Sequence, residues 1–362
     1  MKPKVAYILP IYEEGTDTHF FYNYLLIREA AKTADIFVIV EKCPKLSFGQ
    51  KIDLGEAQIY VQKYKFPPLR FLEMLWMCFK LLSSGFRGFY VHYSYYGVLA
   101  VLLTTWRLSR QVKVFYWNRG MPWLFKQNWL KEKLFRFILR NSILVTGPES
   151  LAKEYVARYG VKEYRVVSNW IDTERFKPDA NKKLSPKIVL FVHHLSKRKG
   201  VDFVPKIAEA FKNDDVEFVV IGAGPEFENC KLEIENSGLT GKVKLLGPVA
   251  NAEVVRYFKD ARVFLMPSRE EGSPRVILEA MASGVPFVAS NIGGIRELVP
   301  KSLENYLCEV GDIECFQGRI KSLLSDEIAY NKARIEALEF SKGFGKEKGV
   351  REFINLFEST DD

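Results

Sequence analysis

The chain has 362 residues, 48% hydrophobic and 27% charged, a composition typical of a soluble globular protein that is too long for one ordinary core. Its net charge is +9, and the excess lies in residues 1–180, which carry 27 Lys and Arg against 16 Asp and Glu, whereas residues 181–362 carry 26 against 28. No apolar run reaches the roughly 18 residues that span a membrane, the start is too acidic for a signal peptide, and no helix-turn-helix, RNP or zinc-finger pattern supports nucleic-acid binding.

The basic first half predicts an anionic partner, either a membrane surface or a phosphorylated acceptor, with nucleic acid as the disfavoured rival. The cysteines are odd in number, scattered and without a CxxC pair, which predicts reduced thiols in a cytoplasmic protein, with no disulfide and no zinc site. These cysteines are Cys43, Cys78, Cys230, Cys308 and Cys315.

In chain order, the first half alternates buried strands with helices. A strand-like run at 4–12 leads through a loop to a helical pattern at 20–32 and a second apolar strand at 35–42. The rhythm continues through the apolar runs FYVHYSYYG, VKVFYWNRG and SILVTG to the helix ESLAKEYVARYG and the run YRVVSNW. Continuous apolar strands that alternate with helices predict a doubly wound parallel sheet.

Residues 176–186, FKPDANKKLSP, are polar, contain two prolines and are predicted to be a linker. The strand-helix rhythm then restarts with KIVLFVHHLSKRKG and continues through VEFVVIGAGPE, KVKLLGPV, RVFLMPSREEG and PFVASNIGG. The sequence therefore predicts an α/β protein of two domains, 1–180 and 181–342. A detached helix in 343–362 is able to dock on either one.

The stretch 270–294, EEGSPRVILEAMASGVPFVASNIGG, combines two glutamates with a predicted helix. Ser273 suits the N-cap, Pro274 the first turn of a helix over 274–283, and Gly284 the C-terminal stop. The helix N-terminus is a natural seat for a phosphate, with Glu271 just ahead of it and Glu279 inside it, so the segment reads as a pocket for a sugar joined to a nucleotide diphosphate. The alternative is that both glutamates are solvated helix charges.

These residues resemble the signature of the retaining, family-4 type of nucleotide-sugar glycosyltransferases (glycosyl transferases group 1), with Glu271 and Glu279 as its E-x7-E motif. Other segments fit the same pattern in order, namely EGTDTH, SNWIDTERFKP, LSKRKG, VIGAGPE, LLGPV and MPSREEG. The resemblance implies the GT-B fold, in which two Rossmann-like domains face a central cleft. It also implies that the helix in 343–362 packs back on the N-terminal domain.

The resemblance also implies roles for individual residues. Glu279 is expected to hold the donor ribose, Glu271 to contact the transferred sugar, and Lys199 to pair with the diphosphate. Taken alone, Lys199 reads as a solvated surface lysine. Further expected donor contacts are the backbone of the segment Gly272, Ser273, Pro274 and Arg275, in which all but the proline offer an amide N–H, Val249 at the base, Gly222 in VIGAGPE, and Gly15 in the N-terminal loop. VIGAGPE also resembles the start of a dinucleotide fingerprint, but it lacks the third glycine and is equally explained as a loop.

Two positions depart from the family pattern. His194 stands where an arginine normally clamps the diphosphate, so it is a weaker substitute that Arg198 would support, or else a structural histidine. Asn118 occupies what looks like the place of a family histidine near the reacting sugar. Asparagine hydrogen-bonds a hydroxyl but does not titrate, so an acid-base role there is in doubt.

Residues 123–140 are predicted to form one helix. Lys126, Lys133, Arg136 and Arg140 fall on one face of it with Trp129, and Leu124, Leu130, Leu134 and Ile138 fall on the opposite face, which suits a core. A basic helix face with aromatic residues indicates peripheral contact with the inner face of an anionic cell membrane. The alternative is a solvated basic helix.

The resemblance thus implies a metal-independent retaining glycosyltransferase without a cofactor. Its donor would be a UDP- or GDP-sugar and its acceptor a carbohydrate or a lipid-linked glycan precursor. A catalytically weak sugar-nucleotide or glycan-binding protein remains the alternative because of the departures at 194 and 118. A nicotinamide-dependent oxidoreductase is disfavoured by the incomplete glycine pattern.

Overall fold

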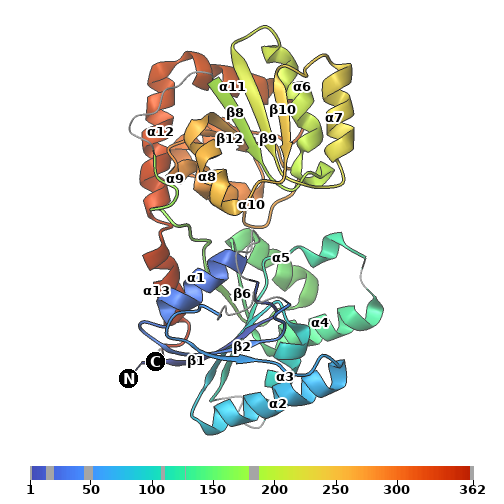
Figure 1. Ribbon diagram of the computed structural model, residues 1–362, viewed down its shortest axis with the longest axis vertical. Coiled ribbons are helices and arrows are strands. Elements are labelled where there is room, and N and C mark those ends of the chain that lie inside the picture. The colour runs from blue at the N-terminus through green and yellow to red at the C-terminus, as the bar shows by residue number, and fades with distance from the viewer. Residues whose placement is uncertain are drawn as a thin grey trace. The chain divides into compact units, whose positions relative to one another are not determined.

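The computed structural model describes residues 2–13, 20–44, 52–106, 111–126, 128–178 and 187–358. Contacts divide the chain into two units: Met1–Ser168 with Glu347–Asp362 form unit 1, and Asn169–Lys346 form unit 2 (Figure 1). Ile171 and Phe176 are fully buried in the core of unit 2, which is why the division falls ahead of residue 180. Part of the predicted linker, residues 179–186, lies outside the described residues.

Unit 1 contains a seven-stranded sheet in the order β3-β2-β1-β4-β5-β6-β7, and all its neighbouring strands are parallel. The first strand lies in the interior and later strands are added on both sides of it, as in a doubly wound sheet. The strands are β1 Lys4–Leu9, β2 Asp35–Val40, β3 Gln58–Val61, β4 Gly88–His92, β5 Lys113–Trp117, β6 Ile143–Thr146 and β7 Tyr164–Val166.

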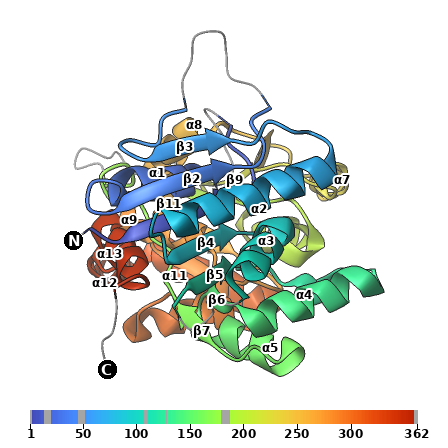
Figure 2. The same cartoon turned by 90° about the horizontal axis from the view of Figure 1, so that it is seen from below.

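The helices of unit 1 cover this sheet. They are α1 Phe20–Ala30, α2 Pro67–Ser83, α3 Tyr95–Thr105, α4 Trp129–Asn141 and α5 Glu149–Tyr159, joined by α13 Lys346–Asn355 from the end of the chain. Figure 2 shows α2, α3 and α4 together on one side of the strands.

Helix α13 returns to unit 1 through an aromatic contact. Phe353 is buried and lies 6.0 Å from Tyr7 of β1 and 5.1 Å from Tyr90 of β4, measured between ring centroids. Phe357, beyond the helix, reaches Phe115 of β5 at 5.1 Å. Three central strands of unit 1 therefore pack against residues that are distant in sequence.

Unit 2 repeats the plan with a six-stranded parallel sheet in the order β10-β9-β8-β11-β12-β13. Its strands are β8 Lys187–Val192, β9 Val216–Ile221, β10 Val243–Gly247, β11 Ala261–Met266, β12 Phe287–Ser290 and β13 Leu307–Cys308. Its helices are α6 Val204–Ala208, α7 Phe227–Asn236, α8 Asn251–Asp260, α9 Arg275–Ala282, α10 Gly293–Arg296, α11 Ile313–Ser325 and α12 Glu327–Lys342. Two parallel sheets with helices confirm the predicted α/β fold of two Rossmann-like units.

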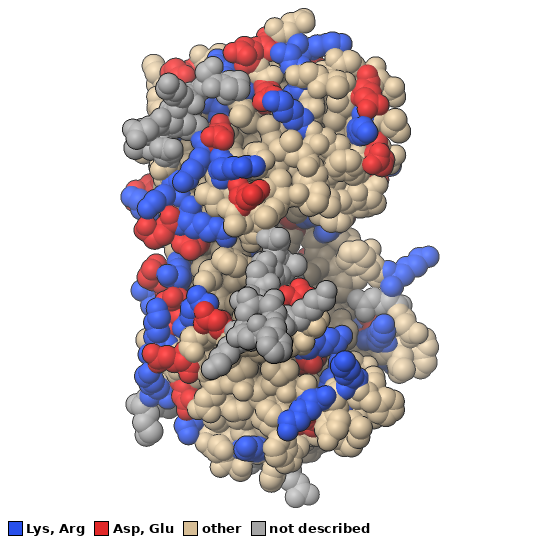
Figure 3. All heavy atoms as spheres, in the orientation of Figure 1, with Lys and Arg blue, Asp and Glu red and all other residues tan. Residues whose placement is uncertain are grey.

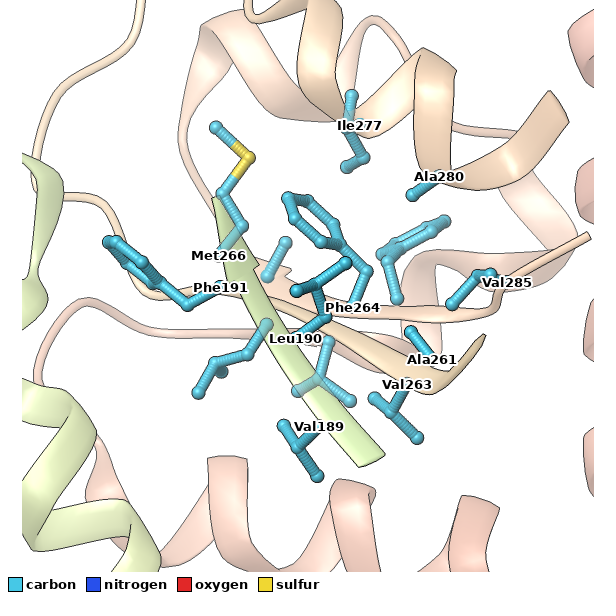
Figure 4. Packing of buried hydrophobic residues seen from close by; sticks show 14 of the residues in the cluster. Val189, Leu190, Phe191, Ala261, Val263, Phe264, Met266, Ile277, Ala280 and Val285 are labelled. Carbon is cyan, nitrogen blue, oxygen red and sulfur yellow. The ribbon is translucent and has the colours of Figure 1, made fainter. Parts of the chain in front are cut away.

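The core of unit 2 fixes the helix that follows the E-x7-E loop. Strand β11 is buried along its whole length, as expected of a central parallel strand covered on both faces. Figure 4 shows Ile277 and Ala280 of α9 directed toward Phe264 of that strand. Because all three side chains are at most 1% exposed, the start of α9 has a defined position over the sheet.

The prediction of one helix over 123–140 is wrong at its start. A short 3₁₀ turn spans Pro122–Leu124, and α4 begins at Trp129, where the side chain of Asn128 caps it by accepting a hydrogen bond from the amide of Leu130 at 2.9 Å. The buried face is also rotated from the predicted one, because Phe135, Ile138 and Leu139 are buried while Leu130 is exposed.

The prediction that all cysteines are reduced is also wrong. Cys308 at the end of β13 and Cys315 in the first turn of α11 form a disulfide, with their Cα atoms 5.8 Å apart. The turn between β13 and α11 brings together two cysteines that are seven residues apart. Cys43, Cys78 and Cys230 are free thiols.

Candidate functional site

Two adjacent strands of unit 2 end at the point where the strand order reverses. Strand β8 is followed along the sheet by β9 on one side and by β11 on the other, so its carboxyl end beside β11 is a topological switch point. Ligands of open α/β sheets bind outside the strand ends at such a point. The loops after β8, β11 and β12 contact one another at this edge of the sheet.

Glycines allow these loops to touch. Gly200 has φ +72°, and a Cβ there would lie 2.0 Å from the carbonyl oxygen of Pro267. A Cβ on Gly294, after β12, would lie 2.4 Å from the carbonyl oxygen of Glu271 and 2.5 Å from that of Gly272. A side chain at either position would separate the loops, so the second glycine of NIGG is required for close backbone approach.

Glu271 is the centre of the resulting cluster. One oxygen of its carboxylate, Oε2, lies 2.6 Å from Lys199 Nζ, and the other, Oε1, lies 2.9 Å from His193 Nε2. The hydroxyl of Ser268 donates to the same Oε1 at 2.9 Å. The Glu271 side chain is 4% exposed and that of Lys199 7%, so the pair is shielded from solvent.

The surroundings keep this carboxyl group ionised. Burial by itself would raise the pKa of Glu271, but the neighbouring His193 and Lys199 outweigh it and lower the pKa to about 2. Burial lowers the pKa of Lys199, and pairing with Glu271 opposes that change. The site is therefore a dry arrangement of one carboxylate and one ammonium group, held close together by packing.

His193 acts in this cluster as a neutral donor. Its pKa is lowered by burial, although Glu271 acts in the opposite direction. The backbone amide of His194 donates to His193 Nδ1 at 2.9 Å, so Nδ1 is an acceptor and Nε2 carries the proton that is shared with Glu271. This tautomer orients the Glu271 carboxylate without adding a charge.

The structure separates His194 from this cluster. The side chain of His194 is exposed, and the hydrogen bonds of this residue are made by its backbone: its amide donates to His193 Nδ1, and its carbonyl accepts from the amide of Ser196 at 3.0 Å. The predicted role of the His194 side chain at the diphosphate therefore gains no support from the contacts around Glu271. The neighbouring Arg198 is partly buried, and its carbonyl accepts a hydrogen bond from the amide of Arg269 at 2.9 Å.

The start of α9 differs from the predicted cap. The helix begins at Arg275 with Pro274 at the N-cap, and Ser273 does not cap it. Instead, Asn169 Nδ2 donates to the hydroxyl of Ser273 at 2.9 Å and to its carbonyl at 2.6 Å. The Arg275 side chain turns to the same segment and donates to the carbonyl of Trp170 at 3.2 Å. The side chains of Ser273 and Arg275 thus anchor the loop before α9. The groups that remain to bind a ligand at this helix N-terminus are those of the backbone.

The remaining predicted donor residues occupy the same unit. Glu279 is half-buried within α9, and Val249 is half-buried after β10 and packs on the core. Gly222 has φ +144°, and a Cβ there would lie 1.8 Å from the carbonyl oxygen of His193, so this glycine supports the loop that carries the site. Gly15 lies outside the described residues.

Asn118 belongs to unit 1, where it is buried in a hydrogen-bond network. Its Oδ1 accepts from the hydroxyl of Tyr155 and from the amide of Gly120, both at 2.9 Å, and its Nδ2 lies 3.2 Å from the hydroxyl of Tyr116. These contacts explain an asparagine at the end of β5 by its support of the following loop.

Two residues of the cluster were absent from the sequence-based set, His193 and Ser268. Both stand in segments that the sequence singled out, HHLSKRKG and MPSREEG. The sequence contained no signal for which of the two adjacent histidines turns inward. That depends on how the end of β8 packs against residues 222–224, in the loop after β9.

No group of three or more His, Cys, Asp or Glu side chains in the described ranges is placed to hold a metal ion. None of the helices in that same part combines the length and the hydropathy that crossing a bilayer requires.

The sequence model of the family called glycosyl transferases group 1 matches residues 172–340. An uncharacterized glycosyltransferase of Haemophilus influenzae is 32% identical over 177 residues, 48% of this chain and 50% of that protein. N-acetyl-alpha-D-glucosaminyl L-malate synthase of Bacillus anthracis is 28% identical over 282 residues, 74% of this chain and 73% of that protein. The chain thus spans about half the length of the first of these relatives.

Solved structures match over almost the whole chain. Sucrose-phosphate synthase from Thermosynechococcus elongatus has a TM-score of 0.74 at 17% identity, covering 98% of both chains. HepE of Anabaena, in complex with UDP and glucose, has a TM-score of 0.76 at 15% identity, covering 98% of this chain and 99% of the other. At these identities the likeness concerns the fold, which is GT-B.

Proposed function

Because residues 172–340 belong to the glycosyl transferases group 1 family, we propose that this chain transfers a sugar from a nucleotide-diphosphate sugar to an acceptor hydroxyl. The observation that carries the proposal is the buried Lys199–Glu271 pair at the switch point of unit 2, beside the start of α9. A pair so deeply shielded costs desolvation energy, which is understandable where a charged and hydroxyl-rich ligand is bound.

In the proposed mechanism unit 2 binds the donor. Lys199, Arg198 and the backbone amides of Gly272, Ser273 and Arg275 stabilise the diphosphate, whose negative charge grows as the sugar leaves. Glu271 accepts hydrogen bonds from hydroxyls of the transferred sugar. Glu279 accepts hydrogen bonds from the ribose.

We further propose that transfer retains the anomeric configuration and needs no metal ion. The acceptor oxygen forms a bond to the anomeric carbon on the face from which the diphosphate departs. The bond to the diphosphate oxygen breaks, and that oxygen takes the proton of the acceptor hydroxyl. This route relies on charge stabilisation rather than on a titrating side chain, so an asparagine at 118 is compatible with it.

UDP- and GDP-sugars are the proposed donors. HepE, which shares the fold, has been solved in complex with UDP and glucose. This supports UDP-sugars as the first donors to test. The proposed acceptor is a carbohydrate or a lipid-linked glycan precursor.

The exposed start of α4 supports the proposal that the chain also contacts an anionic membrane. Trp129 is exposed at the start of α4, and Lys133 Nζ lies 5.1 Å above its ring centroid. Such pairs of aromatic and basic side chains suit the lipid-water interface.

The experiment is a turnover assay of the full chain with UDP-, GDP- and ADP-sugars and a panel of sugar acceptors, with and without EDTA. We expect release of nucleoside diphosphate that depends on one base, is unaffected by EDTA, and yields a product whose anomeric configuration by proton NMR equals that of the donor. Binding of a sugar nucleotide without hydrolysis or transfer would instead establish the catalytically weak binding protein. An inverted product would refute retention.

A further inference from the structure

Exposed aromatic side chains are confined to one part of unit 1. Among the described residues, every exposed Trp, Phe and Tyr lies between residues 64 and 137, while the exposed large apolar residues of unit 2 are all aliphatic. We name as the α2–α3 aromatic surface the exposed residues Tyr64, Phe66, Leu69, Leu72, Trp76, Phe79, Tyr96, Leu103 and Trp106. Scattered exposed apolar side chains are ordinary, but such a concentration indicates a contact surface.

Helix α2 presents an apolar stripe on its outer side as well as on its inner side. Leu69, Leu72, Trp76 and Phe79 recur at three- and four-residue spacing, so they share one face of the helix. Trp76 is 55% exposed and Phe79 68%. The inner face is formed by other residues, which are buried in the core of unit 1 and include Met74, Met77, Cys78 and Leu81. The outer stripe therefore contributes little to the core of unit 1.

The neighbouring helix extends this surface. Helices α2 and α3 pack side by side on the same side of the sheet (Figure 2). Helix α3 adds Tyr96 and Leu103, and Trp106, directly after the helix, is 73% exposed. The surface thus spans two adjacent helices instead of one narrow seam, which suits a broad planar partner.

The charge of the same region selects the chemistry of that partner. Residues 63–106, which contain the whole of this surface, have five Lys and Arg and a single acidic residue, Glu73, so the stretch carries a net charge of +4. Glu73 does not offset this charge at the surface, because it is buried and accepts hydrogen bonds from the hydroxyl of Tyr60 at 2.6 Å and from the amide of Lys63 at 2.9 Å. In Figure 3 the area over α2 and α3 is mostly uncharged, with Lys and Arg side chains set into it.

Aromatic and basic residues are also paired on this surface. Lys80 Nζ lies 5.5 Å above the ring centroid of Trp76, and Lys63 and Lys65 flank Tyr64 in the segment that enters α2. The aliphatic part of a lysine side chain packs along apolar surface while its ammonium group stays in water, where it can pair with anions. Indole rings are enriched at the lipid-water interface. A second copy of this chain is a poor occupant, because two such surfaces would bring like charges together.

We propose that the α2–α3 aromatic surface binds an anionic lipid bilayer, with the apolar stripe of α2 entering the headgroup region and the basic residues around it meeting lipid phosphates. This goes beyond the proposed contact of α4, because the apolar side chains that enter the bilayer belong mainly to α2 and α3. It does not depend on the proposed sugar transfer, since it concerns unit 1 and requires no donor.

Flotation of the full chain with liposomes tests the proposal, using neutral phosphatidylcholine alone and phosphatidylcholine mixed with phosphatidylglycerol. The main variant carries Trp76→Ser, Phe79→Ser and Trp106→Ser. A matched control carries Ile328→Ser and Ile335→Ser, which remove exposed apolar side chains from unit 2. A third variant carries Trp129→Ser and Leu130→Ser on α4. Because all seven side chains are exposed, each variant should unfold at the wild-type temperature.

We expect the wild type and the unit 2 control to float only with anionic liposomes, and the α2–α3 variant to bind them at least tenfold more weakly than wild type. The α4 variant should lose less than the α2–α3 variant. Equal flotation of the α2–α3 variant and the wild type would overturn the proposal, as would equal wild-type binding to neutral liposomes or no binding to either. A wild-type dimer in solution that the α2–α3 variant converts to monomer would identify a second copy as the occupant instead.

Discussion

At the residue scale, Glu271 keeps its charge where water is excluded because protein groups replace the lost hydration. Lys199 and His193 each meet one carboxylate oxygen, and Ser268 donates a further hydrogen bond. Removing one partner of a buried pair leaves the other charge uncompensated, so single substitutions here affect the fold as well as ligand binding. Substitutions that keep size and hydrogen bonding are therefore the informative ones.

Replacing each glutamate of the E-x7-E motif by glutamine should separate their proposed roles. Glu271→Gln should lower turnover at least about 100-fold while leaving the Kd for the bare nucleoside diphosphate within about threefold, because the lost charge faces the sugar. Glu279→Gln should weaken binding of the nucleotide itself by about tenfold, since a charged hydrogen bond to the ribose is lost. Initial rates and titration calorimetry measure the two effects. Parallel losses in both variants would refute the separation.

His193 should make the stability of unit 2 depend on pH in one direction. Because the pKa of His193 lies below its ordinary value of 6.5, the unfolded chain binds more protons than the folded chain as the pH falls from 6.5 toward that lowered pKa. Stability should be fully present above pH 6.5 and decline below it. His193→Gln should remove this part of the decline in urea unfolding across that range. His194→Gln, which removes the exposed neighbouring imidazole, should retain it, and an unchanged profile in His193→Gln would disprove the assignment.

The sequence predicted which two charged residues lie together better than it predicted the contacts around them. Glu271 and Lys199, 72 positions apart, were assigned to one ligand, and the structure brings them to 2.6 Å. The inward turn of His193 rather than His194 was not predictable, because both are the same residue type at a strand end. The prediction that Ser273 caps α9 was wrong for a similar reason. The Ser273 hydroxyl accepts a hydrogen bond from Asn169, which is distant in sequence, instead of from an amide of the helix.

At the scale of elements, the site depends on loops that approach each other more closely than side chains permit. The loop after β9 lies against the loop after β8, and a Cβ on Gly224 would lie 2.1 Å from the carbonyl oxygen of Leu195. That contact is with backbone, so it is not relieved by a rotamer change. The position of Lys199 thus depends on glycines that are distant in sequence.

Gly224→Ala should therefore displace the loop that carries His193 and Lys199. We expect a loss of at least about 2 kcal/mol in the free energy of unfolding, together with weaker donor binding, because a methyl group has no space there. Gly241→Ala is the matched control, since a Cβ there meets no atom within 4 Å, and it should change stability by less than about 0.5 kcal/mol. Urea denaturation followed by circular dichroism measures both. Equal stability of the two variants would contradict the proposed crowding.

Strands were easier to predict than the ends of helices. Buried parallel strands form continuous apolar runs, such as KVAYIL in β1, and this signal survives without tertiary information. The start of α4 was misplaced because the apolar pattern of 123–140 continues through a 3₁₀ turn, whereas the break depends on the Asn128 cap. The Cys308–Cys315 disulfide was missed because pairing depends on the turn between β13 and α11, which spacing alone does not reveal.

At the scale of the whole molecule, the end of the chain stabilises the unit that contains its beginning. Phe353→Ala should lower the stability of unit 1 by about 3 kcal/mol, because it removes a buried ring from the contact with β1 and β4. Hydrogen exchange followed by mass spectrometry resolves the units, and amides of β1 and β4 should exchange faster while those of β8 and β11 remain as in wild type. Uniform acceleration in both units would contradict this assignment.

The two units also differ in surface chemistry. The excess positive charge and the exposed aromatic residues lie in unit 1, whereas the buried Lys199–Glu271 pair lies in unit 2. The charge difference between the halves was visible in composition. The aromatic surface was not, because only the structure distinguishes the outer stripe of α2 from its buried stripe.

The central claim is that Lys199, which Glu271 holds in the buried site, binds the diphosphate of a sugar nucleotide, and titration calorimetry tests it directly. UDP, GDP and ADP are titrated into the wild type, into Lys199→Gln, and into Lys197→Gln, which replaces an exposed lysine of the same turn. We predict that one nucleotide binds the wild type and Lys197→Gln with similar affinity and binds Lys199→Gln about tenfold to a hundredfold more weakly, as expected for the loss of a charged hydrogen bond. Equal affinity of all three proteins for that nucleotide, or no binding of any nucleotide to the wild type, would contradict the claim.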